Sequence, residues 1–558
     1  MKQQSGAAYK PAISEENPVS KQMSSGLVRV RKHARAVVVC VAAMAVAAAL
    51  CACSNSSGSA PGTACAALSG WPVGTLDAAD ASTVDPTQFL SAAQLNTWGV
   101  DLDNRGLRAT GTTAHENYID ELHTRLACAG VTQLSYEEVP LTRWSVDNWS
   151  LSIVGGPSAG PVQTAAYVPY SGVTPAQGVT APLVYLDANT PPTAANAAGK
   201  IVLFDVPQAP TTVGVFEFLS MATYDPDHSL SPTDVYNRPY LAMPGALLNE
   251  LSAAGVAGAI GILPAPYATA HGAYYPYDRI LRSAPSLFVD ENVGAQLKQL
   301  AAAGSATQMN LVLPAEVTQV MTRNLIGIIP GASTDLTVIN SHTDGTNGLE
   351  DNGPNAIVGM AEYLTRLPSS ALPRTIMILL SSGHFAGGIG AETFLSAHQS
   401  DGLLSRIASV VTIEHMGAQE YLPDANGLLA PTGNPELGAF FTPKIQPLVN
   451  ASYNALKNAD AKPGLVVQPT NPGGDGSADN PVWPGEGQYF YGIGGLPTAN
   501  YITGPYYLLN WGVTTADKID FNRMRNEMVA FTQMQLDLSR VSKTDLATIS
   551  PVIVSPSN

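Results

Sequence analysis

Three histidines of this chain directly follow short apolar runs, and carboxylates accompany two of them. His342 follows the first run, His384 the second and His415 the third, with Glu414 beside the last and Asp351 nine residues after the first. Imidazole and carboxylate groups on neighbouring loops can share a divalent cation such as zinc. The chain has only nine histidines, and three at one predicted edge favour a metal site over isolated structural residues.

The apolar runs that precede these histidines are typical of buried strands. They cover 336–341, 375–381 and 408–413, with helical stretches near 355–366 and 443–459. Alternating strands and helices predict an α/β fold with a mainly parallel sheet covered by helices on both faces. Ligands bind at the carboxyl ends of the strands in such sheets. The three histidines are therefore expected to converge.

Two further helices and a strand-rich stretch complete the predicted organisation. Helical spacing of apolar residues marks 114–129 and 521–538, whereas 145–315 is rich in Gly, Pro, Ala, Val and Thr and indicates mostly strands. About 490 residues remain after the N-terminal segment, which is more than one hydrophobic core usually serves. At least two domains are expected.

The N-terminus has the pattern of an export signal. Basic residues at 29–35 precede an uncharged apolar run at 36–52, and a Ser, Gly and Pro-rich tether follows. Residues 50–53 resemble the lipobox at which bacterial signal peptidase cuts before a lipid-modified cysteine, which makes Cys53 the candidate. We expect an exported protein anchored to the cell membrane by lipid; a plain secretory signal is the alternative.

Two cysteines, Cys65 and Cys128, lie outside this segment. An even pair in a protein outside the cytoplasm suggests a disulfide.

The charge balance excludes one class of partner. The chain has 28 basic and 44 acidic residues and a formal net charge of −16. Nucleic acid is an improbable partner, because binding a polyanion needs a basic surface.

Several motifs together resemble one known family. The stretch 323–331, the His342 strand end and the sequence Glu-Asp-Asn-Gly at 350–353 look like the core of the co-catalytic di-zinc aminopeptidases, which include transferrin-receptor-like and glutamate-carboxypeptidase-like proteins. Residues 106–108 and 515–520 resemble other landmarks of that family. The resemblance covers most of 100–540 and implies the corresponding fold.

The same comparison implies an inserted protease-associated domain, since 198–203, 253–258 and 285–289 resemble its motifs. The expected divisions are a signal (1–53), a tether (54–64), the first part of the peptidase-like domain (65–144), the protease-associated domain (145–317), the main peptidase-like part (318–545) and a tail (546–558).

Carried over by motif, the family's functional positions imply a single zinc site. His342, Asp351 and His415 would hold one ion, which suits the three protein ligands and open position of a catalytic zinc. His384 stands at the position of the general base and could act as base or as a fourth ligand.

In this chain, both residues that bind only the second metal in the family are replaced. Phe385 stands where a Glu is expected and Asn510 where a His is expected. We expect that second site to be empty.

Two more carboxylates lie near the predicted site. Asp344 resembles the carboxylate that orients a ligating histidine in the family. Glu414 could be a ligand, a base or an ion-pair partner.

Two functions therefore stand open. One is a zinc-dependent hydrolase, such as an aminopeptidase, that uses one zinc and His384 as base. The other is a catalytically inactive protein of the same fold that binds a peptide or protein at the cell surface.

Overall fold

The computed structural model describes Cys65 and residues 70–303 and 307–556. The predicted signal, the tether and Cys53 lie outside the described residues. Within the described part, no helix combines the length and apolar character needed to cross a membrane.

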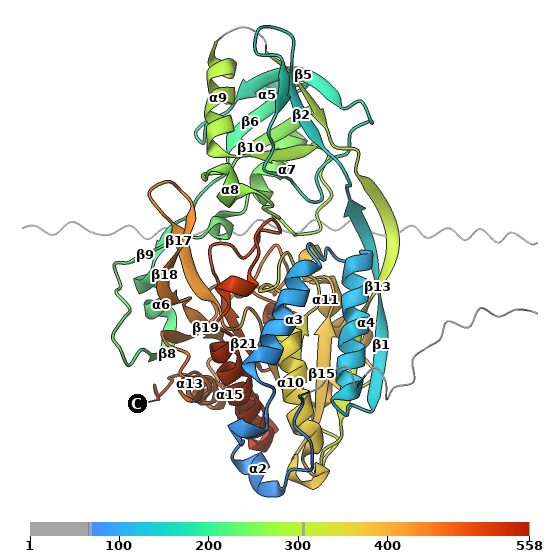
Figure 1. Ribbon diagram of the computed structural model, residues 1–558, viewed down its shortest axis with the longest axis vertical. Coiled ribbons are helices and arrows are strands. Elements are labelled where there is room, and N and C mark those ends of the chain that lie inside the picture. Colours follow the sequence, from blue (N-terminus) through green and yellow to red (C-terminus); the bar gives the residue numbers. More distant parts are fainter. Residues whose placement is uncertain (1–64, 66–69, 304–306, 557–558) are drawn as a thin grey trace, which may run out of the picture. The chain divides into compact units, whose positions relative to one another are not determined.

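The larger of two main sheets has nine strands and is mixed (Figure 1). In spatial order they are β1 (Gln133–Ser145), β13 (Glu316–Ile329), β15 (Thr375–Ser381), β14 (Leu336–His342), β16 (Ile407–Ile413), β21 (Thr498–Thr503), β19 (Gly438–Phe441), β20 (Gly464–Val467) and β8 (Ser220–Tyr224). The four central strands, from β15 to β21, are parallel to one another. Antiparallel pairs flank them on both sides. The expectation of a mainly parallel sheet is thus correct only for its centre.

Helices cover both faces of this sheet, as the sequence predicts. Alternate residues of β14 and β15 enter two different cores. Ile339 and Ile378 pack on the side of α10 (Gly353–Arg366) and α15 (Phe521–Arg540). Val338, Met377 and their neighbours pack with α11 (Ile389–Ala397) and α14 (Gly487–Gly492) on the other side.

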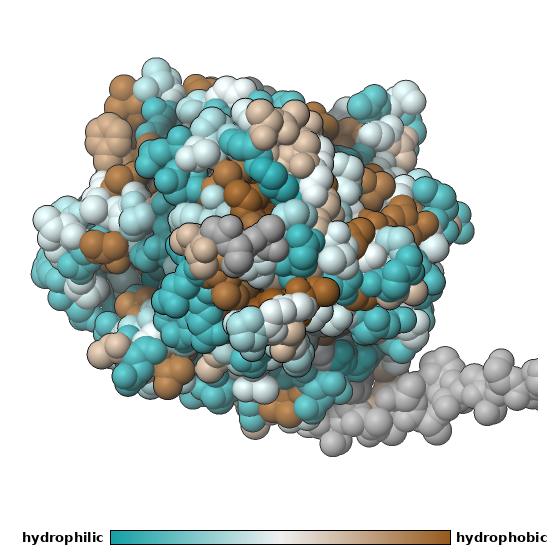
Figure 2. Space-filling view, turned by 90° about the horizontal axis from the view of Figure 1, so that it is seen from above, coloured by the Kyte–Doolittle hydropathy of each residue, from teal (hydrophilic) through white to brown (hydrophobic). Residues whose placement is uncertain are grey.

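The second sheet has eight strands and is also mixed. Its order is β3 (Gly160–Val162), β2 (Ser150–Val154), β12 (Gln308–Val312), β5 (Val179–Tyr185), β6 (Ile201–Asp205), β10 (Gly258–Ile262), β11 (Ser286–Val289) and β4 (Ala166–Tyr167). The chain leaves the larger sheet along β1 and returns along β13, which pair over their length. Figure 2 looks onto the end of the molecule that carries the second sheet, and its surface shows hydrophobic and hydrophilic residues interspersed.

The stretch 145–317 is less uniform than its composition suggests. It contains the helices α5 (Ala194–Ala197), α6 (Val213–Leu219), α7 (Gly245–Ala253), α8 (Tyr267–Ala270) and α9 (Glu291–Ala302) besides its strands. One strand within it, β8, pairs with β20 of the larger sheet. The division of the chain into domains, including a protease-associated one, stays a prediction.

The remaining elements are short or peripheral. They are α2 (Ala78–Ser82), α3 (Ala92–Asn104), α4 (Thr113–Cys128), β7 (Thr211–Thr212), β9 (Val235–Tyr236), α12 (Leu403–Arg406), β17 (Gln419–Pro423), β18 (Leu429–Pro435), α13 (Gln446–Ala459) and α16 (Lys543–Leu546).

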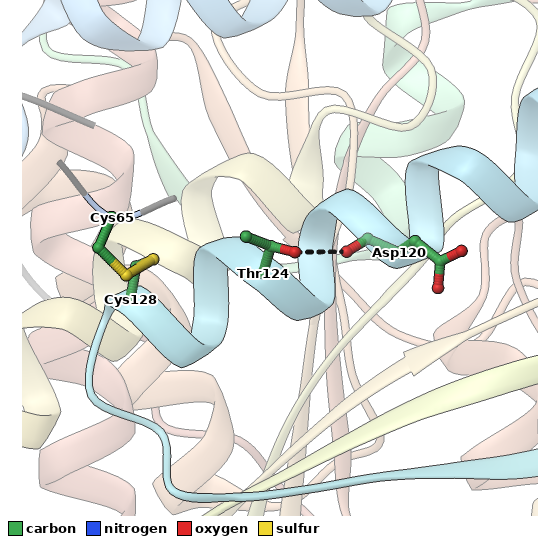
Figure 3. The surroundings of a disulfide bond; sticks show 4 residues. All are labelled: Cys65, Asp120, Thr124 and Cys128. Carbon is green, nitrogen blue, oxygen red and sulfur yellow. Dashed lines mark hydrogen bonds between the residues drawn. A yellow bond between two sulfur atoms is a disulfide. The ribbon is translucent and has the colours of Figure 1, made fainter. Parts of the chain in front are cut away.

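The predicted disulfide is present between Cys65 and Cys128. Figure 3 shows Cys128 at the end of α4, one turn beyond Thr124, whose hydroxyl donates to the carbonyl oxygen of Asp120. The bond ties Cys65, the first described residue, to the end of α4, which lies 63 residues later in the sequence.

Candidate metal centre

The three histidines that follow the apolar runs lie together. His342 ends β14, His384 follows β15 in a short 3-10 turn and His415 follows β16. Because these strands are parallel neighbours, their carboxyl ends meet at one edge. The ring centroids of His342 and His384 are 4.2 Å apart, and those of His342 and His415 are 6.4 Å apart.

Backbone carbonyls fix the tautomers of two of these rings. Nδ1 of His342 lies 2.8 Å from the carbonyl oxygen of Asp344, and Nδ1 of His415 lies 2.7 Å from that of Thr503. A carbonyl oxygen only accepts, so each Nδ1 carries the proton and, in a neutral ring, each Nε2 has a free lone pair. Both Nε2 atoms are buried and have no hydrogen-bond partner within the described residues.

Two buried glutamates face the same nitrogens. Oε2 of Glu414 lies 3.5 Å from Nε2 of His342 and 3.9 Å from that of His415. Oε1 of Glu350 lies 3.8 Å and 3.5 Å from the same two atoms. Oε2 of each glutamate is also buried without a hydrogen-bond partner in the part of the chain that the structure describes.

This donor set fits a zinc ion. Tetrahedral zinc with bonds of about 2.05 Å places its ligand atoms about 3.4 Å apart. The four contacts between imidazole and carboxylate, at 3.5–3.9 Å, approach that spacing. Unpaired buried polar groups are costly, and a shared cation would satisfy His342, His415 and Glu414, which form one group of candidate ligating atoms.

His384 is held by a carboxylate that the sequence analysis did not single out. Its Nδ1 lies 2.9 Å from Oε2 of Glu486, whose Oε1 accepts from the hydroxyl of Ser381 at 2.6 Å. His384 also forms a group of ligating atoms with His342 and Glu350. It can therefore serve either as a metal ligand or as a base beside the metal.

Asp351 lies elsewhere than the resemblance implies. Both of its oxygens accept from the guanidinium of Arg108, at 2.7 Å and 2.5 Å, and both side chains are fully buried. Neither group of candidate ligating atoms includes Asp351. The neighbouring residue, Glu350, faces the histidines instead.

Asp344 orients the site in a different way from that expected. Its carbonyl oxygen, rather than its carboxylate, contacts His342. The carboxylate accepts from the backbone N–H groups of His384 and Phe385, at 3.1 Å and 2.9 Å, and from the hydroxyl of Thr110. Asp344 thus fixes the turn that carries His384.

Phe385 and Asn510, which stand where the resemblance expects ligands of the second metal, make other contacts in this structure. The ring of Phe385 packs against Tyr274 and Tyr277, with centroids 5.6 Å and 4.9 Å away. The amide of Asn510 donates to the carbonyl oxygens of Thr269 and His271, at 3.0 Å and 3.1 Å. Neither residue belongs to the candidate ligand groups.

The backbone is strained at His415, where φ is +52°. A residue other than glycine in this left-handed region costs about 1–3 kcal/mol and persists where its surroundings hold it. Asn352 exchanges two hydrogen bonds with the backbone of Met416, and the N–H of Gly417 donates to Glu527 at 2.8 Å. The loop is thereby fixed with His415 turned toward the cluster.

Burial and mutual charge shift the pKa values of these groups. Burial raises the pKa of Glu350 to about 8 and lowers that of His415 to about 4. For Glu414, burial acts upward, but the contact with His342 outweighs it and lowers the pKa to about 2. Burial acts downward on His342, but Glu350 and Glu414 raise its pKa well above the usual value. Without a metal ion, a proton on His342 must offset the carboxylate charge.

Two contributors to the site, Glu350 and Glu486, escape sequence reasoning for different reasons. Glu350 stands beside Asp351, and only the distant Arg108 decides which of the two carboxylates faces the histidines. Glu486 lies in a Gly and Pro-rich stretch outside the predicted strand ends, so no local pattern indicates it.

Comparison with solved structures defines the class of fold. A zinc aminopeptidase from Bacillus subtilis matches with a TM-score of 0.55 and 15% identity, over 82% of this chain and 97% of that one. A peptidase M28 precursor from Shewanella amazonensis SB2B matches with a TM-score of 0.55 and 16% identity, over 89% and 99%. An aminopeptidase from Aneurinibacillus sp. strain AM-1 matches with a TM-score of 0.51 and 13% identity, over 84% and 97%.

Sequence comparison gives a weaker relationship. A "probable leucine aminopeptidase" of Trichophyton verrucosum (strain HKI 0517) is 26% identical over 159 residues, which is 26% of this chain and 40% of the relative. No family model matches the chain. The chain therefore has an aminopeptidase-like metallopeptidase fold with a buried His/Glu cluster.

Proposed function

We propose that this protein is a single-zinc hydrolase that acts on the N-terminus of peptides or on a related amide. The carrying observation is the convergence of the unpaired buried Nε2 atoms of His342 and His415 with the unpaired Oε2 of Glu414, beside Oε1 of Glu350. When bound, zinc lowers the pKa of a water molecule and polarises a carbonyl group.

Three of the donors are fixed by contacts on their other atoms. His342 and His415 are held through Nδ1. Oε1 of Glu414 accepts from the N–H of Glu486 at 2.8 Å and from Asn500 at 3.0 Å. No hydrogen bond to the carboxylate of Glu350 is found among the described residues. His342, His415 and Glu414 would hold the zinc ion, and Glu350, whose carboxylate is not fixed, would be a further donor beside it.

His384 supplies the base in this proposal. Its Nδ1–H donates to Glu486, which leaves Nε2 as the proton acceptor. A base oriented by a carboxylate is the usual arrangement for proton transfer near neutral pH.

The test is metal content measured together with turnover. The full chain, purified without chelators, should contain one zinc and hydrolyse some members of a panel of aminoacyl 4-nitroanilides. His415→Asn should lose the metal and the activity, because Asn tolerates the left-handed backbone but lacks the imidazole. The control His398→Ala, which removes a partly buried imidazole paired with Asp401, should change neither.

A catalytically silent binding protein is the second candidate. The observation that favours it is the burial of the cluster, since His342, Glu350, Glu414 and His415 are each at most 2% exposed. One bound zinc without turnover of any substrate would select this candidate. Absence of zinc would overturn the metal assignment.

We further propose that the protein is exported and carries lipid on Cys53, and that 145–317 is a protease-associated domain. The disulfide Cys65–Cys128 supports export, because such bonds persist in oxidising compartments. Cys53→Ser should move the protein from the membrane fraction to the soluble fraction; unchanged fractionation would argue against a lipid anchor.

A further inference from the structure

A segment that follows α8 covers the metal centre. We call residues 271–282 the capping segment. The ring of Tyr277 lies over His384 and Phe385, with centroid distances of 5.4 Å and 4.9 Å. Tyr277 precedes His342, the first histidine of the centre, by 65 positions, so the contact is tertiary and not a local turn.

The first end of the capping segment is held by buried contacts. Asn510 donates to the carbonyl oxygens of Thr269 and His271. The N–H of Tyr274 donates to Leu509 at 2.9 Å, and that of Trp511 donates to Gly272 at 2.9 Å. Asn510 stands where the related family has its last metal ligand, and here its amide anchors the cap.

The other end is also held by buried contacts: the N–H of Arg282 donates to the carbonyl oxygen of Tyr170 at 2.9 Å, and its side chain, 2% exposed, donates to Asn249 at 2.8 Å and pairs with Asp278. Tyr277 and Arg279 add contacts between the two ends. The N–H of Gly387 donates to the carbonyl oxygen of Tyr277 at 3.0 Å. Arg279 forms an ion pair with Glu392 at 3.0 Å, and these side chains are 30% and 26% exposed. Partly exposed ion pairs contribute little to stability. The capping segment is thus anchored at both ends, with Tyr277 between them.

The hydroxyl of Tyr277 is available to a ligand. No hydrogen bond to it is found in the part of the chain that the structure describes. Burial, together with the charges of Glu350, Glu414 and Glu486, raises its pKa, so the hydroxyl keeps its proton. A neutral phenol beside several carboxylates is a hydrogen-bond donor for an oxygen atom that binds in the same place.

We propose that Tyr277 is a ligand-contacting residue of this site: its ring closes the site over His384, and its hydroxyl donates to the carbonyl oxygen of a bound amide. The chemical nature of the ligand rests on the proposed function. The closing role of the Tyr277 ring is independent of that function. The inserted stretch thus contributes a side chain to the site.

The experiment uses the full chain with Tyr277→Phe, Tyr277→Ala and, as control, Tyr275→Phe, whose ring packs on Phe288 and away from the centre. The first measurement is the rate of carbethoxylation of His384 by diethyl pyrocarbonate, followed by mass spectrometry. Tyr277→Ala should raise this rate at least tenfold, whereas Tyr277→Phe and the control should leave it unchanged. An unchanged rate in Tyr277→Ala would overturn the closing role, whether or not zinc is present.

The second measurement is the affinity for leucine hydroxamate by calorimetry. Loss of one hydrogen bond to a polar ligand group should weaken binding by Tyr277→Phe about tenfold, at unchanged zinc content, and leave the control unaffected. Equal affinities of wild type and Tyr277→Phe would overturn the donor role. A wild type that binds neither zinc nor hydroxamate would overturn the proposed function and the donor role, while the carbethoxylation result would still decide the closing role.

Discussion

Arg108 and Asp351 form a fully buried ion pair in which both carboxylate oxygens accept from the guanidinium. The resemblance to co-catalytic aminopeptidases would make Asp351 the carboxylate shared by two metals. Here a fixed cation from a segment 243 residues earlier neutralises it. This relationship supports the single-metal site proposed above.

The first prediction separates Asp351 from the adjacent site. Asp351→Asn should keep one zinc per chain, because Asp351 is bound to Arg108. It should lower the free energy of unfolding by about 3–5 kcal/mol, the usual cost of leaving one member of a buried pair uncompensated. Elemental analysis and urea unfolding check the two parts.

Glu414→Gln is the matched comparison, since it should lose zinc. If Asp351→Asn lost its zinc while remaining folded and Glu414→Gln kept it, the ligand set would be that implied by the family resemblance.

The sequence predicts the strand ends but not the partners across the fold. His342, His384 and His415 are recognisable because each follows an apolar run, and parallel strands bring such positions together. The choice of Glu350 over Asp351 depends on Arg108, and that contact is invisible to local patterns. The antiparallel flanks of the sheet escape prediction for the same reason, because pairing partners such as β20 and β8 are more than two hundred residues apart.

The second prediction concerns the orientation of His384. Glu486→Gln should lower kcat about 10–100-fold at unchanged zinc content, because an amide in place of the carboxylate no longer stabilises the protonated imidazole. Steady-state kinetics, with zinc content measured on the same samples, check it. Glu420→Gln, a partly buried carboxylate of β17 that pairs with Arg238, serves as control; equal kcat in Glu486→Gln and wild type would exclude the orienting role.

The third prediction concerns the strained loop at His415. Asn352→Ala removes both hydrogen bonds to Met416, and each buried partner left unpaired costs about 1–3 kcal/mol. The loop should relax, and the zinc affinity should fall at least tenfold in competition with a chelating dye. Asn434→Ala, on an exposed position of β18, should behave as wild type. If Asn352→Ala had the zinc affinity of the wild type, the left-handed backbone at His415 would be stable without these two hydrogen bonds.

The fourth prediction concerns the disulfide. Cys128→Ser should lower the free energy of unfolding by about 2–4 kcal/mol, since the bond closes a loop of 63 residues in the unfolded chain. Reductant should bring the wild type to the stability of the variant and leave the variant unchanged. A wild type that is insensitive to reductant would mean that the bond does not contribute to stability.

The last prediction concerns the pH dependence of the metal-free protein. The folded-state pKa of Glu350 is about 8, above its unfolded value, and that of His342 is also raised. The folded state therefore binds more protons than the unfolded state, and stability falls as pH rises from 6.5 to 8. His415, with a lowered pKa of about 4, acts in the opposite sense only below pH 6.5. Each such proton changes the free energy of unfolding by about 1.4 kcal/mol per pH unit.

Urea unfolding of chelator-treated protein at pH 6.5 and 8.0 should show this decline, and Glu350→Gln should reduce it. Zinc-loaded protein should show little decline, because the ion takes the place of the protons. A metal-free protein that was equally stable at both pH values would contradict the shared burial of these charges.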